Sequence, residues 1–247
     1  MQFNQTINGI NVCASYSEEE VDGIFVPLLK QLVAICEEKK ERVIMMLAAP
    51  PGAGKSTLAS FLEHLSRKLT RDYKIQAIGM DGFHRRQEYL LSHTVIVDGN
   101  TVRMVDIKGA PVTFDLEALK NKIEMVASGN VCGWPAYDRL LHNPVEDALE
   151  IDGDIIILEG NYLLLDEEGW REVSDFADYT VSITADPEML KERLLARKKA
   201  SGATDDEAER FVSFSDMANV RLCLEKTKPA DLELMLTNGS GYRRMSQ

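Results

Sequence analysis

The first apolar pattern along the chain has the spacing of a helix. Between residues 17 and 39, large apolar side chains recur every three or four positions: Val21, Ile24, Phe25, Leu28, Leu29, Leu32 and Val33. This spacing places them on one face of a helix. Ser17, followed three positions later by Glu20, is typical of a capping box. The pattern therefore predicts an amphipathic N-terminal helix over residues 17–39.

Short apolar runs of strand length follow this segment. They cover residues 42–47, 73–80, 153–159, 179–184 and 232–236. The run at 153–159 contains three consecutive isoleucines, which is typical of a central strand buried on both faces. We expect the run at 232–236 to be the last strand, at an edge of the sheet.

Segments with helical spacing lie between these runs. Residues 55–70 carry leucines on one face, residues 86–92 have helical potential, and residues 115–127 follow the N-cap residue Asp115. Further helix starts are marked by the pairs Asp186–Pro187 and Thr204–Glu207.

Strands that alternate with helices predict an α/β fold in which a parallel sheet is wrapped by helices. The chain shows no internal repeat and no segment with the composition of a linker. We therefore expect a single domain over residues 1–247.

The composition excludes several classes of protein. Lys and Arg number 28 and Asp and Glu number 40, so the formal net charge is −12. Such an acidic surface repels phosphate backbones, which disfavours general nucleic-acid binding. No apolar run approaches the ~18 residues that a membrane span needs. The start lacks the pattern of a secretion signal, and Cys13, Cys36, Cys132 and Cys223 form no C-x-x-C pair. We expect a cytoplasmic protein with reduced thiols and no membrane partner.

The strongest chemical signal is the turn between the run at 42–47 and the helix at 55–70. From Ala49 to Thr57 it reads APPGAGKST, close to the phosphate-binding pattern G-x-x-x-x-G-K-[ST], with Ala49 in place of the first glycine. The residues expected to hold the phosphates of ATP are Gly52, Ala53, Gly54, Lys55, Ser56 and Thr57. Lys55 is expected to reach the β- and γ-phosphates, and Ser56 to bind Mg²⁺.

Acidic residues follow two of the predicted strands. Asp81 comes directly after the run at 73–80, and Glu159 ends the run at 153–159. In an open parallel sheet, ligands bind at the carboxyl ends of the strands. We therefore interpret Asp81 as the catalytic base and Glu159 as a second Mg²⁺ ligand beside Ser56. Capping a turn and forming a salt bridge are the structural alternatives for these two residues.

At this point the sequence resembles a known family. The segments MDGFHR at 80–85, PAYD at 135–138 and LEGNY at 158–162 are similar to segments of phosphoribulokinases, uridine kinases and type I pantothenate kinases. The segment GAPVTFD at 109–115 resembles less characterised members, some of them associated with fructose uptake. This resemblance implies a three-layer P-loop NTPase fold of the nucleoside-kinase type with a helical lid, and Asp81 as the base. It also implies an acceptor-binding region over residues 82–145.

Within that region the resemblance implies acceptor contacts from His84, Arg85, Tyr137 and His142. One position departs from the pattern: uridine kinases carry an aromatic residue two positions after the tyrosine, where this chain has Arg139. A guanidinium suits a carboxylate or phosphate, so we expect an anionic or densely hydroxylated acceptor that Arg139 contacts. In the competing account Arg139 points outward and pairs with Asp138 or Glu146.

A basic segment, KERLLARKK at 191–199, stands out in this acidic chain. Arg193 and Arg197 lie four positions apart and share a helix face. Gly202 beyond them allows a turn, so we expect residues 190–215 to form a lid whose two arginines neutralise the transferring phosphoryl group. The alternative is a solvated basic helix face.

These observations together favour an ATP- and Mg²⁺-dependent kinase that phosphorylates a hydroxyl of a small polar molecule such as a sugar or sugar phosphate. A nucleoside or pantothenate kinase is the enzymatic alternative, and an ATP-hydrolysing regulatory switch is an alternative of another class. The sequence leaves open the acceptor, whether the protein is a monomer or a homodimer, and the roles of Asp216, Asn219 and the segment GYRR at 241–244.

Overall fold

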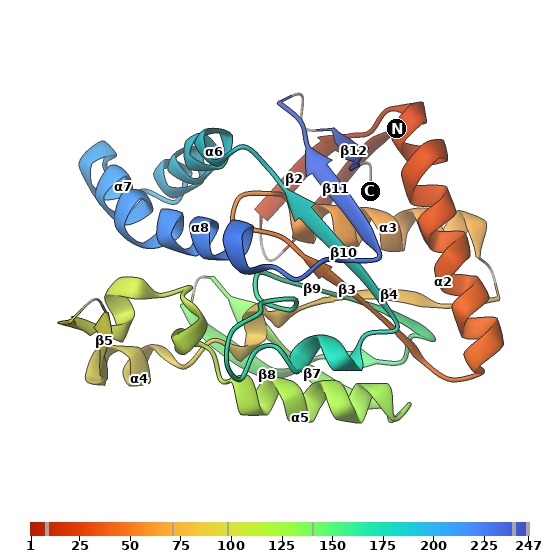
Figure 1. Cartoon of the computed structure of the whole chain (residues 1–247), viewed down its shortest axis with the longest axis horizontal. Helices are drawn as coiled ribbons and strands as arrows, with labels where there is room; N and C mark the ends of the chain where they lie inside the picture. The colour runs from red at the N-terminus through yellow and green to blue at the C-terminus, as the bar shows by residue number, and fades with distance from the viewer. Residues whose placement is uncertain (8–9, 71, 98, 140, 239–240, 246–247) are drawn as a thin grey trace.

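The computed structural model contains a six-stranded sheet at its centre, flanked by helices (Figure 1). It describes all residues except 8–9, 71, 98, 140, 239–240 and 246–247. The strand order is β12-β11-β10-β3-β9-β4, and all neighbours are parallel except β12, which is antiparallel to β11. The prediction of a parallel sheet wrapped by helices is confirmed.

The strands of the central sheet are β3 (Val43–Ala48), β4 (Ile75–Gly79), β9 (Ile155–Gly160), β10 (Tyr179–Thr184), β11 (Leu232–Leu236) and β12 (Tyr242–Arg244). The larger helices are α2 (Val26–Lys39), α3 (Lys55–Leu69), α5 (Leu116–Ala127), α6 (Pro187–Ala200) and α8 (Met217–Lys226). The shorter ones are α1 (Glu18–Glu20), α4 (Gln87–Ser92) and α7 (Asp205–Phe211). A π-helical turn (Val21–Phe25) joins α1 to α2, so the helix predicted over residues 17–39 forms with Ser17 as its N-cap.

Alternation along β3 explains the three layers. Every residue of β3 is buried, and successive side chains of a strand point to opposite faces. Met45 packs in the apolar core beneath α2 and α3, whereas Met46 packs in the second core, which contains residues of α5. The α/β architecture therefore rests on two apolar cores, one on each face of the sheet.

Three β-hairpins were not predicted from the hydrophobic pattern. They are formed by β1 (Gln2–Ile7) with β2 (Ile10–Ser15), β5 (Thr94–Val97) with β6 (Asn100–Arg103), and β7 (Cys132–Asp138) with β8 (Asn143–Ile151). Their strands alternate weakly, and most residues of β5 and β8 are exposed. One prediction is wrong: β11 is not an edge strand, because the C-terminal β12 pairs with its outer side.

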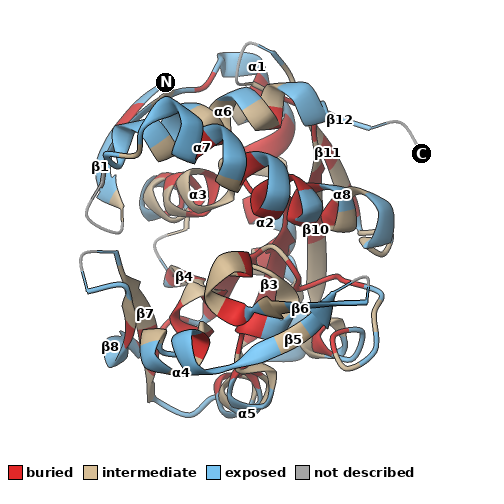
Figure 2. Cartoon of the chain, turned by 90° about the vertical axis from the view of Figure 1, so that its left-hand side faces the viewer, coloured by how far each residue is buried: buried red, intermediate tan, exposed pale blue. Residues whose placement is uncertain are grey.

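The predicted lid segment forms α6 and α7, which a turn at Gly202 connects with a backbone φ of 97°. Asp186 and Thr204 cap the two helices as expected. Figure 2 shows α6, α7 and α8 on one side of the molecule and α4 with the hairpins β5–β6 and β7–β8 on the other. Within the described part of the chain, no helix is both long and apolar enough to cross a membrane.

Candidate functional site

The turn between β3 and α3 has the backbone of a phosphate-binding loop. Gly52 and Gly54 adopt φ values of 86° and 83°, in the left-handed region that favours glycine. Gly54 is the N-cap of α3, and Lys55 is its first residue. The loop therefore ends at a helix N-terminus, where free backbone amides and the helix dipole favour an anion.

Two side chains hold the outer carbonyls of this loop. The Tyr242 hydroxyl donates to the Ala53 carbonyl over 3.2 Å, and the Arg193 guanidinium donates to the Gly52 carbonyl over 3.4 Å. In a planar trans peptide the N–H points away from the C=O. A hydrogen bond that holds the Ala53 carbonyl outward therefore turns the Gly54 amide inward, toward the space where phosphate would bind. The sequence alone did not assign this role to Tyr242 or to Arg193.

Glu159 lies at the carboxyl end of β9, next to the loop. Its carboxylate accepts a 2.7 Å hydrogen bond from the Ser56 hydroxyl and stands 3.9 Å from the Lys55 ammonium. Glu159 is 6% exposed, and burial raises its pKa above the usual value, against the charge of Lys55. The structure thus brings together the two residues predicted as metal ligands.

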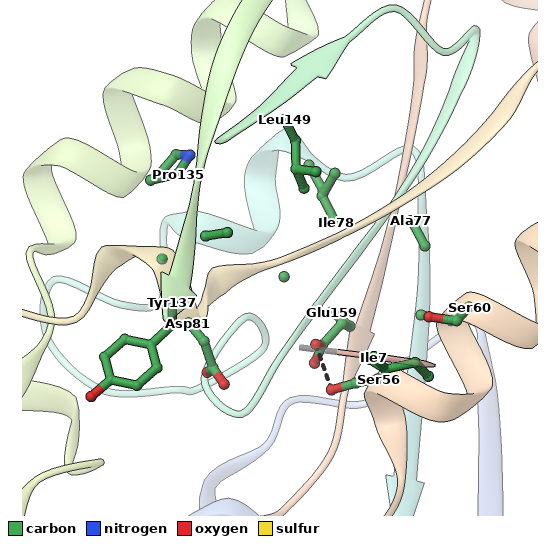
Figure 3. A pocket seen from close by; sticks show the side chains of 14 residues that line it. Ile7, Ser56, Ser60, Ala77, Ile78, Asp81, Pro135, Tyr137, Leu149 and Glu159 are labelled. Carbon is green, nitrogen blue, oxygen red and sulfur yellow. Dashed lines mark hydrogen bonds between the residues drawn. The ribbon is translucent and has the colours of Figure 1, made fainter. Parts of the chain in front are cut away.

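Asp81 follows β4 in a 3₁₀ turn, Met80–Phe83. Figure 3 shows its carboxylate beside that of Glu159, at a small pocket of about 90 Å³ that Ser56 and Tyr137 also line. Burial raises the pKa of Asp81, but electrostatic interactions with His84 and Lys55, and smaller ones with Arg139 and Arg197, outweigh burial and hold it below the usual value. Asp81 is therefore ionised at neutral pH and can accept a hydrogen bond from a hydroxyl group.

Close packing against β7 fixes the turn that carries Asp81. A Cβ atom on Gly82 would lie 2.1 Å from the Pro135 carbonyl oxygen, so only glycine fits there. The Trp134 indole N–H donates to the Gly79 carbonyl over 2.9 Å. The segment that resembles the acceptor region of the kinases is thus attached directly to the turn of Asp81.

A larger cavity of about 1180 Å³ opens next to this turn, between the lid helices and the β7–β8 hairpin. Its lining includes the predicted site residues Lys55, Asp81, His84, Tyr137, Arg139, His142 and Arg197. Burial raises the pKa of Tyr137 to about 12, so its hydroxyl stays protonated. Burial also lowers the pKa of His84, whose Nδ1 lies 2.8 Å from the Asp81 backbone carbonyl.

Arg139 lines the cavity, and its charge helps to lower the pKa of Asp81. One of the two acids considered as an outward partner, Glu146, lies 3.6 Å from Arg86 instead. These contacts favour the cavity-facing interpretation of Arg139.

Two predicted site residues lie elsewhere. Arg85 contacts Asp115 at 3.4 Å and stands over the Tyr89 ring, and it does not line the cavity. Arg193 contacts the outer face of the P-loop, so the structure separates it from Arg197. Arg197 lines the cavity and Arg193 does not, and the closure of both arginines over the γ-phosphate stays a prediction.

Other residues of the cavity were not assigned from the sequence. Lys108, Asn161, Asp216 and Asn219 all line it. Lys108 immediately precedes the GAPVTFD segment, and Asn161 lies within the LEGNY segment, two positions after Glu159. Asp216 and Asn219 lie on the helical stretch that ends in α8.

The side chains beside the loop include oxygen ligands suited to a metal ion. Among the described residues, no group of three or more His, Cys, Asp or Glu side chains could enclose one. Mg²⁺ in nucleotide sites is held by one or two protein oxygens together with phosphates and water. Ser56 and Glu159, with oxygens 2.7 Å apart beside the loop, fit that requirement.

Comparison with known proteins agrees with this geometry. The model of the family described as AAA domain matches residues 45–212. The uncharacterized protein YggC of Escherichia coli (strain K12) is 39% identical over 243 residues, which cover 98% of each chain. A pantothenate kinase of Shewanella loihica is 27% identical over 240 residues, which cover 86% of this chain and 72% of that protein.

Among solved structures, a candidate fructose transport system kinase from Silicibacter sp. TM1040 matches with a TM-score of 0.75 and 27% identity. The match covers 85% of this chain and 98% of that one. The resemblance that the motifs indicated is thereby confirmed, as is the P-loop kinase fold.

Proposed function

The chain belongs to the AAA domain family of P-loop proteins, and from this premise we propose that it is an ATP-dependent kinase of a small polar molecule. One observation carries the proposal. The P-loop, the hydrogen-bonded pair Ser56–Glu159 and Asp81 lie together at the carboxyl ends of β3, β9 and β4. Lys55 and Asp81 also line a cavity large enough for a second substrate. Known ligand sites are mostly about 300–1,000 Å³.

In this proposal each residue of the site has a separate role. Loop amides and Lys55 hold the triphosphate, and Arg197 approaches the γ-phosphate from the lid. Ser56 and Glu159 hold Mg²⁺, which would neutralise charge on the phosphates. Asp81 orients the acceptor hydroxyl and takes its proton. Positioning and electrostatic stabilisation supply most of the rate enhancement in such transfers.

The acceptor pocket distinguishes this proposal from a regulatory ATPase. A switch that hydrolyses ATP needs no second cavity, whereas Tyr137, Arg139 and His142 line one beside Asp81. Pantothenate kinase is the second candidate, because named pantothenate kinases are among the relatives and pantothenate is an anionic hydroxy acid.

The test is acceptor-dependent release of ADP. The purified chain is incubated with ATP, Mg²⁺ and a panel of sugars, sugar phosphates, sugar acids, nucleosides and pantothenate. We expect one class of acceptor to raise ADP formation at least tenfold over the acceptor-free rate, and Lys55→Ala to abolish the increase. An acceptor-free rate that no compound changes would favour the regulatory ATPase instead.

A further inference from the structure

The wall of the cavity formed by the helical stretch around α8 carries polar groups that the proposed reaction does not use. Asp216 ends a π-helical turn, Val212–Asp216, and Asn219 lies one turn further along. Both line the cavity and are strongly buried, with exposed fractions of 9% and 5%. Asn161, just beyond the end of β9, lines the same cavity.

Hydrogen-bond acceptors in this wall lack partners. The Asn161 Oδ1 atom is buried without a hydrogen bond in the described part of the chain. The Asp216 carboxylate has no hydrogen-bond partner and no cation within 4 Å among the described residues, and burial raises its pKa although Arg197 and Lys198 are near. Buried polar groups are nearly always hydrogen-bonded in folded proteins. Both groups accept hydrogen bonds, so they are complementary to a ligand that donates them.

Lys108 presents the opposite charge in the same cavity. Its ammonium donates to the Gln87 amide oxygen over 2.7 Å and to the His142 backbone carbonyl over 3.1 Å, and it stands 5.1 Å from the centre of the Tyr137 ring. These partners are all uncharged, and no carboxylate of the described residues lies within 4 Å. An ammonium has three donors, so one donor and the full charge are available to an anionic ligand.

Lys108 and the acceptor groups around α8 belong to one continuous surface. Gly109, the neighbour of Lys108, lies against the Asn219 side chain, whose Nδ2 is 3.5 Å from the position of a Cβ on Gly109. The Tyr162 hydroxyl donates to the Gly109 carbonyl over 2.6 Å and fixes this segment. A single ligand next to Asp81 is therefore flanked by a cation and by a set of hydrogen-bond acceptors.

We propose that Asp216, Asn219 and Asn161 bind hydroxyl groups of the acceptor while Lys108 binds its anionic group, so that the acceptor is a polyol with a carboxylate or a phosphate. This inference rests on the proposed function, since it names the substrate class of the same site. A neutral nucleoside leaves Lys108 unpaired, and an amino sugar places a positive charge beside it.

Equilibrium binding separates this subsite from the phosphoryl transfer. Calorimetric titrations use the chain saturated with a non-hydrolysable ATP analogue and Mg²⁺, so that no acceptor is phosphorylated during the measurement. The probes are gluconate, fructose 6-phosphate, pantothenate, fructose, glucosamine and uridine. We expect an anionic polyol to bind at least tenfold more tightly than fructose, glucosamine or uridine.

Variants then assign the two ends of the ligand. Lys108→Met should weaken binding of the anionic polyol tenfold or more and leave fructose binding unchanged. Asp216→Asn should weaken both. Asp206→Asn, an exposed acid on α7, and Lys226→Met, an exposed lysine that pairs with Glu167, are the matched controls and should change neither.

Each outcome decides one of the two proposals. Binding that needs Lys108 and Asp216, without ADP formation by the wild-type chain, supports the subsite and overturns the kinase. Phosphorylation of an acceptor whose affinity neither variant alters supports the kinase and overturns the subsite. Tightest binding of uridine, fructose or glucosamine, or a loss of ATP affinity alone in Asp216→Asn, also overturns the subsite.

Discussion

The Ser56 hydroxyl donates a 2.7 Å hydrogen bond to the Glu159 carboxylate, across 103 positions of the chain. Parallel pairing of β3 with β9 produces this contact, because Leu47 is opposite Glu159 in the register, and the loop after β3 then starts α3 beside it. Ser56 and Glu159 form the proposed Mg²⁺ site. The contribution of the negative charge of Glu159 can therefore be tested by substitution.

Glu159→Gln keeps the size of the side chain and its hydrogen bond with Ser56 but removes the negative charge. We expect the Mg²⁺ concentration for half-maximal activity to rise by roughly tenfold or more, as changes near metal ligands commonly do. Activity is measured against Mg²⁺ at saturating ATP and acceptor, with Glu150→Gln, an exposed acid on β8, as the control. An unchanged Mg²⁺ requirement would remove Glu159 from the metal site.

Asp81→Asn keeps the hydrogen-bonding shape of the side chain but cannot take a proton. General-base catalysis contributes roughly 10²–10⁴-fold, and kcat should fall within that range while ATP affinity stays nearly constant. Single-turnover rates and nucleotide binding are measured side by side. Lost ATP affinity with intact kcat would make Asp81 a nucleotide or metal ligand instead of the base.

Tyr242→Phe removes the hydroxyl that holds the Ala53 carbonyl and preserves the ring, which packs near Tyr16 and Phe25. A hydrogen bond of this kind contributes about 0.5–1.5 kcal/mol, which corresponds to roughly a twofold to tenfold increase in the KM for ATP. The acceptor KM and kcat should change little. Tyr73→Phe, just before β4, is the matched control. A defect confined to kcat or to the acceptor would contradict the positioning role.

These residues show what the sequence could predict. The capping boxes, the P-loop and the acids at strand ends are visible because they depend on neighbours within a few positions or on the general rule that parallel strands end together. The contact between Tyr242 and Ala53 spans 189 positions, and no local sequence pattern predicts it. The charges of Lys108 and Asp216 became informative only once the fold placed them at one cavity.

The half-buried side chain of His84 predicts a pH dependence of stability. Burial lowers its pKa below the value of about 6.5 for a free histidine, so the unfolded chain binds this proton more readily than the folded chain. The contribution of His84 is fully present above about pH 6.5 and is lost as the pH falls from there toward the folded-state pKa. Urea unfolding of the nucleotide-free protein at pH 7.5 and 5.5 should show this loss, and His84→Phe should reduce it. His64→Gln on α3 is the control, and an equal loss in wild type and His84→Phe would refute the assignment.

Arg139, which lines the cavity, provides a direct test of acceptor chemistry. Its guanidinium lines the cavity together with Tyr137 and His142, and it can make a two-point contact with a carboxylate or phosphate. Losing a charge-assisted hydrogen bond costs about 1.5–3 kcal/mol. Arg139→Met should therefore raise the acceptor KM tenfold or more and leave the KM for ATP in place.

The chain offers a matched control for this substitution in Arg86→Met. Arg86 is an exposed arginine in the same region whose partner Glu146 lies 3.6 Å away, on β8. Because this pair is outside the lining of the cavity, the control should leave both KM values unchanged. Two results would contradict this role: Arg139→Met behaves like the control, or the wild-type chain prefers uridine to every anionic acceptor. In either case Arg139 does not bind an anionic group of the acceptor, and it replaces the aromatic residue of uridine kinases for another reason.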